Sequence, residues 1–216
     1  MNATAFSRAV AAALLLGTGT AATAAVTSMG LAGFSGGESV ISYDTADWFL
    51  PVDGQIIDGV AHGFTMGGNS STDATVDIGP GVLDYVEPFS VEGDAAGVLT
   101  LAFGGPQTRI GFGWALSLAP PGGGAVELFD DNGVSLGSLA FSGDPDSFTG
   151  VVTGFAGVQS DTAFWRAEVS WNQAGRFALD NLRFTSAASD GVPEPGTLVL
   201  LGLGLAGLAA SCRHKR

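Results

Sequence analysis

The chain has 216 residues and carries 21 acidic side chains against eight lysines and arginines, which gives a formal net charge of −13 at neutral pH. This acidic excess argues against a nucleic-acid-binding protein, because such proteins present cationic patches to the phosphates. The single cysteine excludes a fold held together by disulfide bonds within the chain.

The first 25 residues have the pattern of a secretory signal peptide. Arg8 precedes an apolar run over 9–16, and the small residues Ala22 and Ala24 follow. A basic start, a short apolar run and an A-x-A-like site are the three parts of such a signal. We therefore predict a signal peptide over 1–25, cleaved after Ala24 or Ala25, and a mature chain outside the cytoplasm.

Residues 26–191 are predicted to form one domain with a strongly acidic surface. This segment has no lysine or cysteine, and its only basic residues are four arginines. Set against 20 of the 21 acidic residues, they leave a net charge of −16. Such a field keeps an exported protein soluble, and it disfavours an anionic polymer as a partner unless a divalent cation bridges the two.

Short apolar runs between turn signals predict an all-β sandwich or barrel for this domain. The expected strands are 38–43, 60–66, 74–78, 97–103, 108–117, 125–130, 134–141, 150–158, 163–171 and 176–185. Loops are expected at 66–73, 119–124 and 142–147. The clearest hairpin turns at Asn132-Gly133, which we expect to supply the positive φ angles of a tight turn.

Alternation along two strands predicts which tryptophans face the core. The two sets that share a face are Ile110, Phe112, Trp114 and Leu116, and Trp165, Ala167, Val169 and Trp171. We therefore expect Trp114, Trp165 and Trp171 in the core. Trp48 has no such partners, and it is the best candidate among the four for an exposed surface that stacks a sugar ring. Packing beneath a loop is the alternative for Trp48.

Three acidic residues are candidates for metal binding or catalysis. Asp180 shares a strand face with apolar residues, so its carboxylate must be hydrogen-bonded, paired or metal-bound. The simplest alternative is that it caps backbone amides at a bend in the strand. Glu127 and Glu168 lie on central strands and could act as the two carboxylates of a glycoside hydrolase if they faced each other across a groove. Pairing with Arg166 or simple solvation is the competing interpretation.

Other catalytic motifs lack essential parts. Residues 33–37 match G-x-S-x-G, but the match lies near the mature N-terminus with no alternation of strand and helix after it. His62 is the only histidine of the domain, so most catalytic triads and histidine-based zinc sites cannot be assembled.

The last 25 residues, 192–216, form three ordered parts. Pro193 and Pro195 prevent a helix from crossing them, and residues 197–212 contain no charge. A helix over 197–212 is about 24 Å long, against a hydrocarbon core of about 30 Å that snorkelling and local thinning can match. Arg213, Lys215 and Arg216 form a cationic stop that should remain cytoplasmic.

This tail resembles the PEP-CTERM sorting signal of exopolysaccharide-producing Gram-negative bacteria, with Pro193, Glu194 and Pro195 as its motif. The resemblance implies recognition by an exosortase, transient anchoring in the inner membrane, cleavage near the motif, and a final place at the cell surface or outside the cell.

A second resemblance concerns the domain. The hairpin over 126–139 and the strand over 177–184 look like the jelly-roll core of galactose-binding and carbohydrate-binding modules. It implies a jelly-roll-type antiparallel β-sandwich and an exopolysaccharide as partner. Such modules often hold a structural calcium where the first and last strands meet, which makes Glu38 and Asp180 candidate ligands. The expected function is a non-catalytic surface or matrix protein, and the alternatives are a secreted jelly-roll glycoside hydrolase and a purely structural matrix component.

Overall fold

The computed structural model describes residues 24–34, 36–117, 122–146, 150–172 and 174–187. The tail over 192–216, and the predicted signal peptide apart from Ala24 and Ala25, lie outside these ranges. The elements are β1 (Val26–Ser28), η1 (Leu31–Gly33, a 3-10 turn), β2 (Ser39–Ile41), β3 (Ile56–Ile57), β4 (Val60–Met66), β5 (Asn69–Ser70), β6 (Thr75–Asp77), β7 (Ser90–Asp94), β8 (Gly97–Leu116), β9 (Gly123–Phe129), β10 (Ser135–Ser142), β11 (Asp144–Pro145), β12 (Val152–Trp171) and β13 (Arg176–Ser186).

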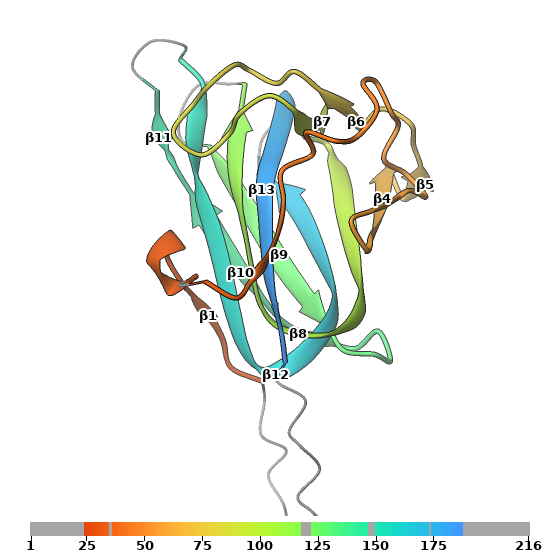
Figure 1. Cartoon of the computed structure of the whole chain (residues 1–216), viewed down its shortest axis with the longest axis vertical. Coiled ribbons are helices and arrows are strands. Elements are labelled where there is room, and N and C mark those ends of the chain that lie inside the picture. The colour runs from red at the N-terminus through yellow and green to blue at the C-terminus, as the bar shows by residue number, and fades with distance from the viewer. Residues whose placement is uncertain (1–23, 35, 118–121, 147–149, 173, 188–216) are drawn as a thin grey trace, which may run out of the picture.

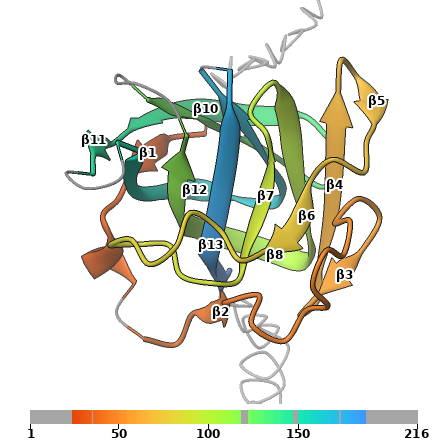
Figure 2. The same cartoon turned by 90° about the horizontal axis from the view of Figure 1, so that it is seen from above.

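Two long bent strands, β8 and β12, pass through both layers of a sandwich (Figures 1 and 2). In the first layer, the first half of β12 pairs with β1 and β11 along one edge and with the second half of β8 along the other. The second half of β8 then pairs with β13, β13 with β7, and β7 with β6. In the second layer, β10, β9, the second half of β12, the first half of β8 and β4 lie side by side. Every pairing is antiparallel, and the chain passes repeatedly between the layers. This confirms the predicted all-β, jelly-roll-type antiparallel β-sandwich.

The core lies between the layers and is built from alternate residues of the strands. Ile110, Phe112, Trp114 and Leu116 of β8 are fully buried. Trp114 packs on Phe141 and Trp171, with ring centroids 5.1 and 6.0 Å away. Each layer therefore presents one apolar face to the other, as period-2 patterning requires.

Two pairs of predicted strands are single strands in the structure. Residues 97–103 and 108–117 both belong to β8, and 150–158 and 163–171 both belong to β12. The pairing of β12 with β8 shifts register between Gln159 and Phe164 and again between Phe164 and Arg166. The chain bends at these irregularities and continues into the other layer, because β-bulges turn a strand without ending it.

The same bulge corrects one core prediction. Phe164 is fully buried, whereas Trp165 is only half-buried. The register shift after Phe164 moves Trp165 off the face that Ala167, Val169 and Trp171 share. The prediction of a core position is confirmed for Trp114 and Trp171 and is wrong for Trp165.

The hairpin between β9 and β10 turns over residues 130–134. Gly133 has φ 77°, and the Gly133 amide donates to the Asp130 carbonyl at 3.2 Å. The Asp130 carboxylate accepts bonds from the Asn132 and Val134 amides. Asn132 does not adopt a positive φ, so the expectation of two such residues holds for Gly133 alone.

The predicted membrane helix over 197–212 cannot be compared with the structure, because it lies outside the described ranges. Within those ranges, none of the helical structure is long and apolar enough to cross a membrane.

Candidate functional site

In the first layer, the central strand β8 presents small residues on its outer face. In one row across the sheet, Ala115 of β8 is the Cα partner of Ala178 and of Thr153. In the next row, Gly113 is the partner of Asp180 on β13 and of Phe155 on β12. Small side chains on an outward face leave room for another segment to lie directly on the sheet.

That segment is residues 78–89, which join β6 to β7 and which we call the strap. In Figure 1 it crosses in front of β13 and reaches toward β11. A side chain at Gly113 would overlap the Tyr85 carbonyl, so the strap backbone lies directly on the sheet there. Leu83 and Val86 of the strap are buried against the two alanines, Ala115 and Ala178.

Asp180 lies under the strap and is only 1% exposed. Its Oδ2 accepts a bond from the Glu87 amide at 2.9 Å. The Asn181 amide and side-chain Nδ2 donate to Oδ1 and Oδ2 at 2.6 and 2.9 Å, and Asn181 has φ 52° where the pairing of β13 shifts register. Burial raises the pKa of Asp180 to about 6, against the opposing effect of the Glu87 and Asn181 amide bonds. Asp180 therefore caps backbone amides at a strand bend.

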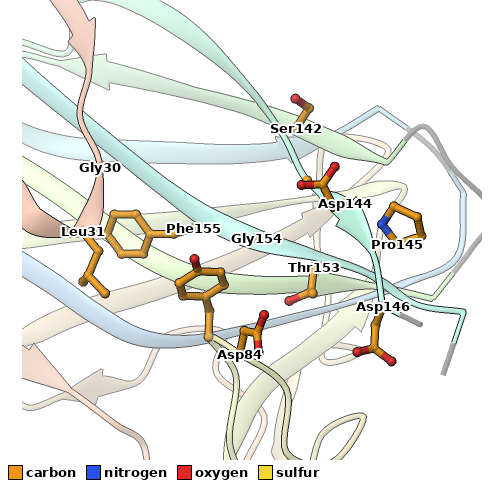
Figure 3. Close-up of a pocket in the computed structure, with 12 residues that line it drawn as sticks. Gly30, Leu31, Asp84, Ser142, Asp144, Pro145, Asp146, Thr153, Gly154 and Phe155 are labelled. Carbon is orange, nitrogen blue, oxygen red and sulfur yellow. The ribbon is translucent and has the colours of Figure 1, made fainter. Parts of the chain in front are cut away.

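A cleft of about 490 Å³ opens beside the strap (Figure 3). It is lined by Gly30, Leu31, Asp84, Tyr85, Ser142, Gly143, Asp144, Pro145, Asp146, Thr153, Gly154 and Phe155. The Tyr85 and Phe155 rings meet with centroids 6.2 Å apart and an interplanar angle of 49°. Figure 3 shows Asp84, Asp144 and Asp146 around the opening and Phe155 at one side.

A second cavity of about 240 Å³ continues from this cleft. The two share Leu31, Asp84, Tyr85 and Phe155, and the second reaches Glu87 and Arg183. We refer to the two together as the groove. Its walls combine aromatic rings, carboxylates and hydroxyl groups.

The two predicted calcium ligands have different partners. Glu38 Oε1 lies 3.3 Å from Arg183 Nη1, and Glu38 Oε2 accepts a bond from the Gly36 amide at 2.8 Å. The pKa of Glu38 is lowered, first by a hydrogen bond from its own amide and then by the Gly36 amide and Arg183. In the ranges that the structure describes, no three histidine, cysteine or acidic side chains gather as a metal would require. Calcium binding by Glu38 or Asp180 stays a prediction.

Trp48 is 57% exposed and stacks on Phe49, with ring centroids 4.7 Å apart and planes 14° from parallel. Its Nε1 donates to Asp77 Oδ1 at 3.1 Å, and Phe49 adopts a positive φ of 59°. Trp48 is therefore not packed beneath a loop, and its stacking on a sugar stays a prediction.

Glu127 and Glu168 do not face each other across a groove. They are direct Cα partners on the adjacent strands β9 and β12. Glu127 accepts a bond from Ser135 Oγ at 2.6 Å, and Glu168 pairs with Arg166 at 3.2 Å. Arg166 also lies 4.0 Å from the centroid of the Phe129 ring. Each carboxylate has its own partner on the outer face of the second layer.

Sequence patterning did not identify Asp84, Tyr85, Asp144 or Phe155 as members of one site. A signal was present in the stretch Ile110–Leu116, where glycine and alanine alternate with large apolar residues. Such a strand has nothing of its own to present outward, which indicates that another part of the chain covers it.

The sequence and structure were compared with known proteins. Residues 191–216 match the family model of the PEP-CTERM protein-sorting motif. The chain therefore carries this sorting motif, which marks an exported, exosortase-processed protein with a transient membrane anchor. No curated protein matches the sequence.

The fold is similar to those of solved structures that include the following three. The K2 cleaved adhesin domain of Lys-gingipain aligns with a TM-score of 0.46 and 10% identity, covering 70% of this chain and 99% of that domain. A variant of a family 29 carbohydrate-binding module complexed with cellulohexaose gives 0.39 and 12%, covering 72% and 96%. The enzymatically active domain of tailspike protein 4 from bacteriophage CBA120 gives 0.34 and 16%, covering 62% and 20%.

Proposed function

We propose that this protein is a non-catalytic component of the cell surface or extracellular matrix of a Gram-negative bacterium, and that it binds a neutral polysaccharide in the groove. The observation that carries the proposal is the composition of the groove wall. Tyr85 and Phe155 lie beside the carboxylates of Asp84 and Asp144 and the hydroxyl of Thr153.

This combination matches the chemistry of a sugar ring. The apolar C–H face of a pyranose packs on an aromatic ring, and its hydroxyls donate to carboxylates. A few polar groups in a partly apolar cleft are the usual make-up of a small-molecule site. The acidic groove and the domain's charge of −16 oppose uronate-rich or sulfated polymers, so a neutral polymer fits best.

The non-catalytic assignment is supported by the positions of the carboxylates first considered for hydrolysis. A glycosidase places two carboxyl groups on either side of the scissile bond. Glu127 and Glu168 are neighbours within one layer, and each is engaged by a residue of that layer.

The placement of the chain ends supports a tether at one end of the sandwich. The start of β1 pairs with Ser160 at the bend of β12, and the Ala187 amide after β13 donates to the Pro106 carbonyl at the bend of β8. The strap crosses near the other end of the sandwich (Figure 1). An anchor that follows β13 would therefore leave the groove accessible from outside the membrane.

Binding can be tested by calorimetric titration of the full chain in detergent with soluble glucan, mannan and galactan, and with polygalacturonate as the anionic comparison. We expect one neutral polymer to bind and polygalacturonate not to bind. Tyr85→Ala should weaken binding about tenfold, since an aromatic contact contributes on the order of 1.4 kcal/mol. Trp48→Ala tests the predicted second contact in the same way.

Val134→Ala is the matched control for Trp48→Ala, because Val134 in the β9–β10 turn is 59% exposed and Trp48 is 57% exposed. Absence of binding to every polymer would favour the purely structural matrix role, and release of sugar would favour the hydrolase. The same samples melted with and without calcium test the predicted structural ion.

A further inference from the structure

The strap follows one row of residues across the first layer, step by step. The row runs from Asp180 on β13 through Gly113 on β8 to Phe155 on β12. Above it, the Glu87 amide bonds to Asp180, the Tyr85 carbonyl lies on Gly113, and the Tyr85 ring meets Phe155. The backbone of Glu87 and Val86 thus connects Asp180 to Tyr85 in the groove wall.

At the start of the strap, the Gly79 amide bonds to the Glu92 carboxylate of β7. Beyond that point, apart from the bond to Asp180, the contacts of the strap with the sheet are weak. Leu83 and Val86 pack mainly on alanines, which bury little apolar area. The Phe89 amide reaches Asp44 Oδ1 only at 3.4 Å. A loop held by few apolar contacts opens at low free-energy cost. The bond from the Glu87 amide to a buried carboxylate is therefore a large part of what keeps the strap closed, since hydrogen bonds to charged groups are the stronger ones.

We propose that Asp180 is a positioning residue for the groove: its carboxylate latches the strap through the Glu87 amide and so places Tyr85 and Asp84 in the groove wall. The inference rests on the proposed function of the groove, and it concerns a residue that touches no ligand there.

The substitution Asp180→Asn tests the latch with little change of shape. Asp180 accepts three bonds with two oxygens, and an asparagine offers one acceptor and one donor in the same place. The Glu87 amide then either loses its acceptor or bonds to a neutral amide oxygen in place of the charged carboxylate, and its bond is weaker in both cases.

The measurement has two arms, both on the full chain in detergent. In the first, hydrogen exchange is followed at the Glu87 and Leu83 amides, which bond to Asp180 and to the Val86 carbonyl. We expect Asp180→Asn to speed exchange at both at least tenfold, with no change at Val169 in the second layer. In the second arm, affinity for the neutral polymer should fall at least tenfold.

Two further variants separate positioning from general loss of stability. Gly113→Ala pushes on the Tyr85 carbonyl without altering Asp180 and should weaken binding similarly. Val126→Ala removes a fully buried side chain of the second layer, and should lower the melting temperature while leaving affinity unchanged.

Unchanged exchange at Glu87 in Asp180→Asn would overturn the proposal, and so would faster exchange with unchanged affinity. If the wild-type chain binds none of the polymers, the proposed function fails, and the exchange arm still decides whether Asp180 latches the strap.

Discussion

At the scale of single residues, Asp180 shows how a buried charge is accommodated. An aspartate among apolar strand residues can be bonded, paired or metal-bound, and the sequence leaves these open. The structure places three N–H donors on its carboxylate, two of them from Asn181. Asn181 can turn its amide inward because it adopts the left-handed conformation, which asparagine tolerates better than most residues.

The raised pKa of Asp180 predicts how stability depends on pH. Its carboxyl has an ordinary pKa of 3.8 and a pKa of about 6 in the fold. The neutral form is therefore favoured on folding, so the contribution is fully present below pH 3.8 and is lost as the pH rises through about 6. The difference corresponds to about 3 kcal/mol.

We expect the free energy of unfolding of the wild type to fall more between pH 4 and pH 7.5 than that of Asp180→Asn, by about 2 kcal/mol, because part of the contribution is already lost at pH 4. Urea titrations of both chains at the two pH values measure this difference. The other titrating groups are common to both chains and cancel in the comparison. Parallel pH profiles would contradict the assignment of a raised pKa to Asp180.

At the scale of elements, glycines decide where segments approach and where they turn. Gly113 lets the strap lie on β8, because any side chain there would meet the Tyr85 carbonyl. Gly133 instead turns the β9–β10 hairpin with φ 77°, and open space surrounds the position where its Cβ would be. The first glycine is required for packing and the second only for its backbone conformation.

Gly133→Ala isolates the backbone effect. We expect it to lower the free energy of unfolding by about 1 kcal/mol, because alanine is strained at a positive φ. Gly105→Ala is the control: Gly105 also has free space around a Cβ but no positive φ. Thermal melts of the two variants should show a lower melting temperature for Gly133→Ala alone, and equal melting temperatures would contradict this explanation of the turn.

At the scale of the whole molecule, the sorting motif and the sandwich have separate tasks. The motif at 191–216 marks an exported protein that is processed by an exosortase, and we propose that the sandwich makes the contacts of the exported protein. The ends of the described chain lie together at the bends of β8 and β12, away from the strap. In the function proposed above, this arrangement lets a temporary anchor and the groove act without obstructing each other.

Deletion of residues 193–216 should release the protein from the membrane, because it removes the apolar segment and its cationic stop. Replacing Pro193 and Pro195 by alanine is the matched control, since it keeps the apolar segment and changes only the motif. That variant should accumulate in the membrane fraction at full length. Fractionation and immunoblotting measure both outcomes, and unchanged membrane retention after the deletion would contradict the role of the tail.

The sequence by itself determined the fold class, the sorting motif, and the buried faces of residues 110–116 in β8 and 167–171 in β12. These follow from local patterns. Alternation determines which side of a strand is apolar, and the sorting motif is recognised from the order of its three parts in the sequence. It also determined that Asp180 needs partners, since burying a bare carboxylate is costly.

Only the tertiary structure decided which residues form the groove, because Leu31, Asp84, Asp144 and Phe155 are far apart in sequence. It alone decided that β8 and β12 continue through their bends, and that a bulge moves Trp165 off the core face. Both depend on pairing with distant strands, and local patterning carries no information about such pairing. Asp180 depends on both the sequence and the tertiary structure. Its sequence context required a partner, and the crossing of the strap over the sheet determined that one partner is the Glu87 amide.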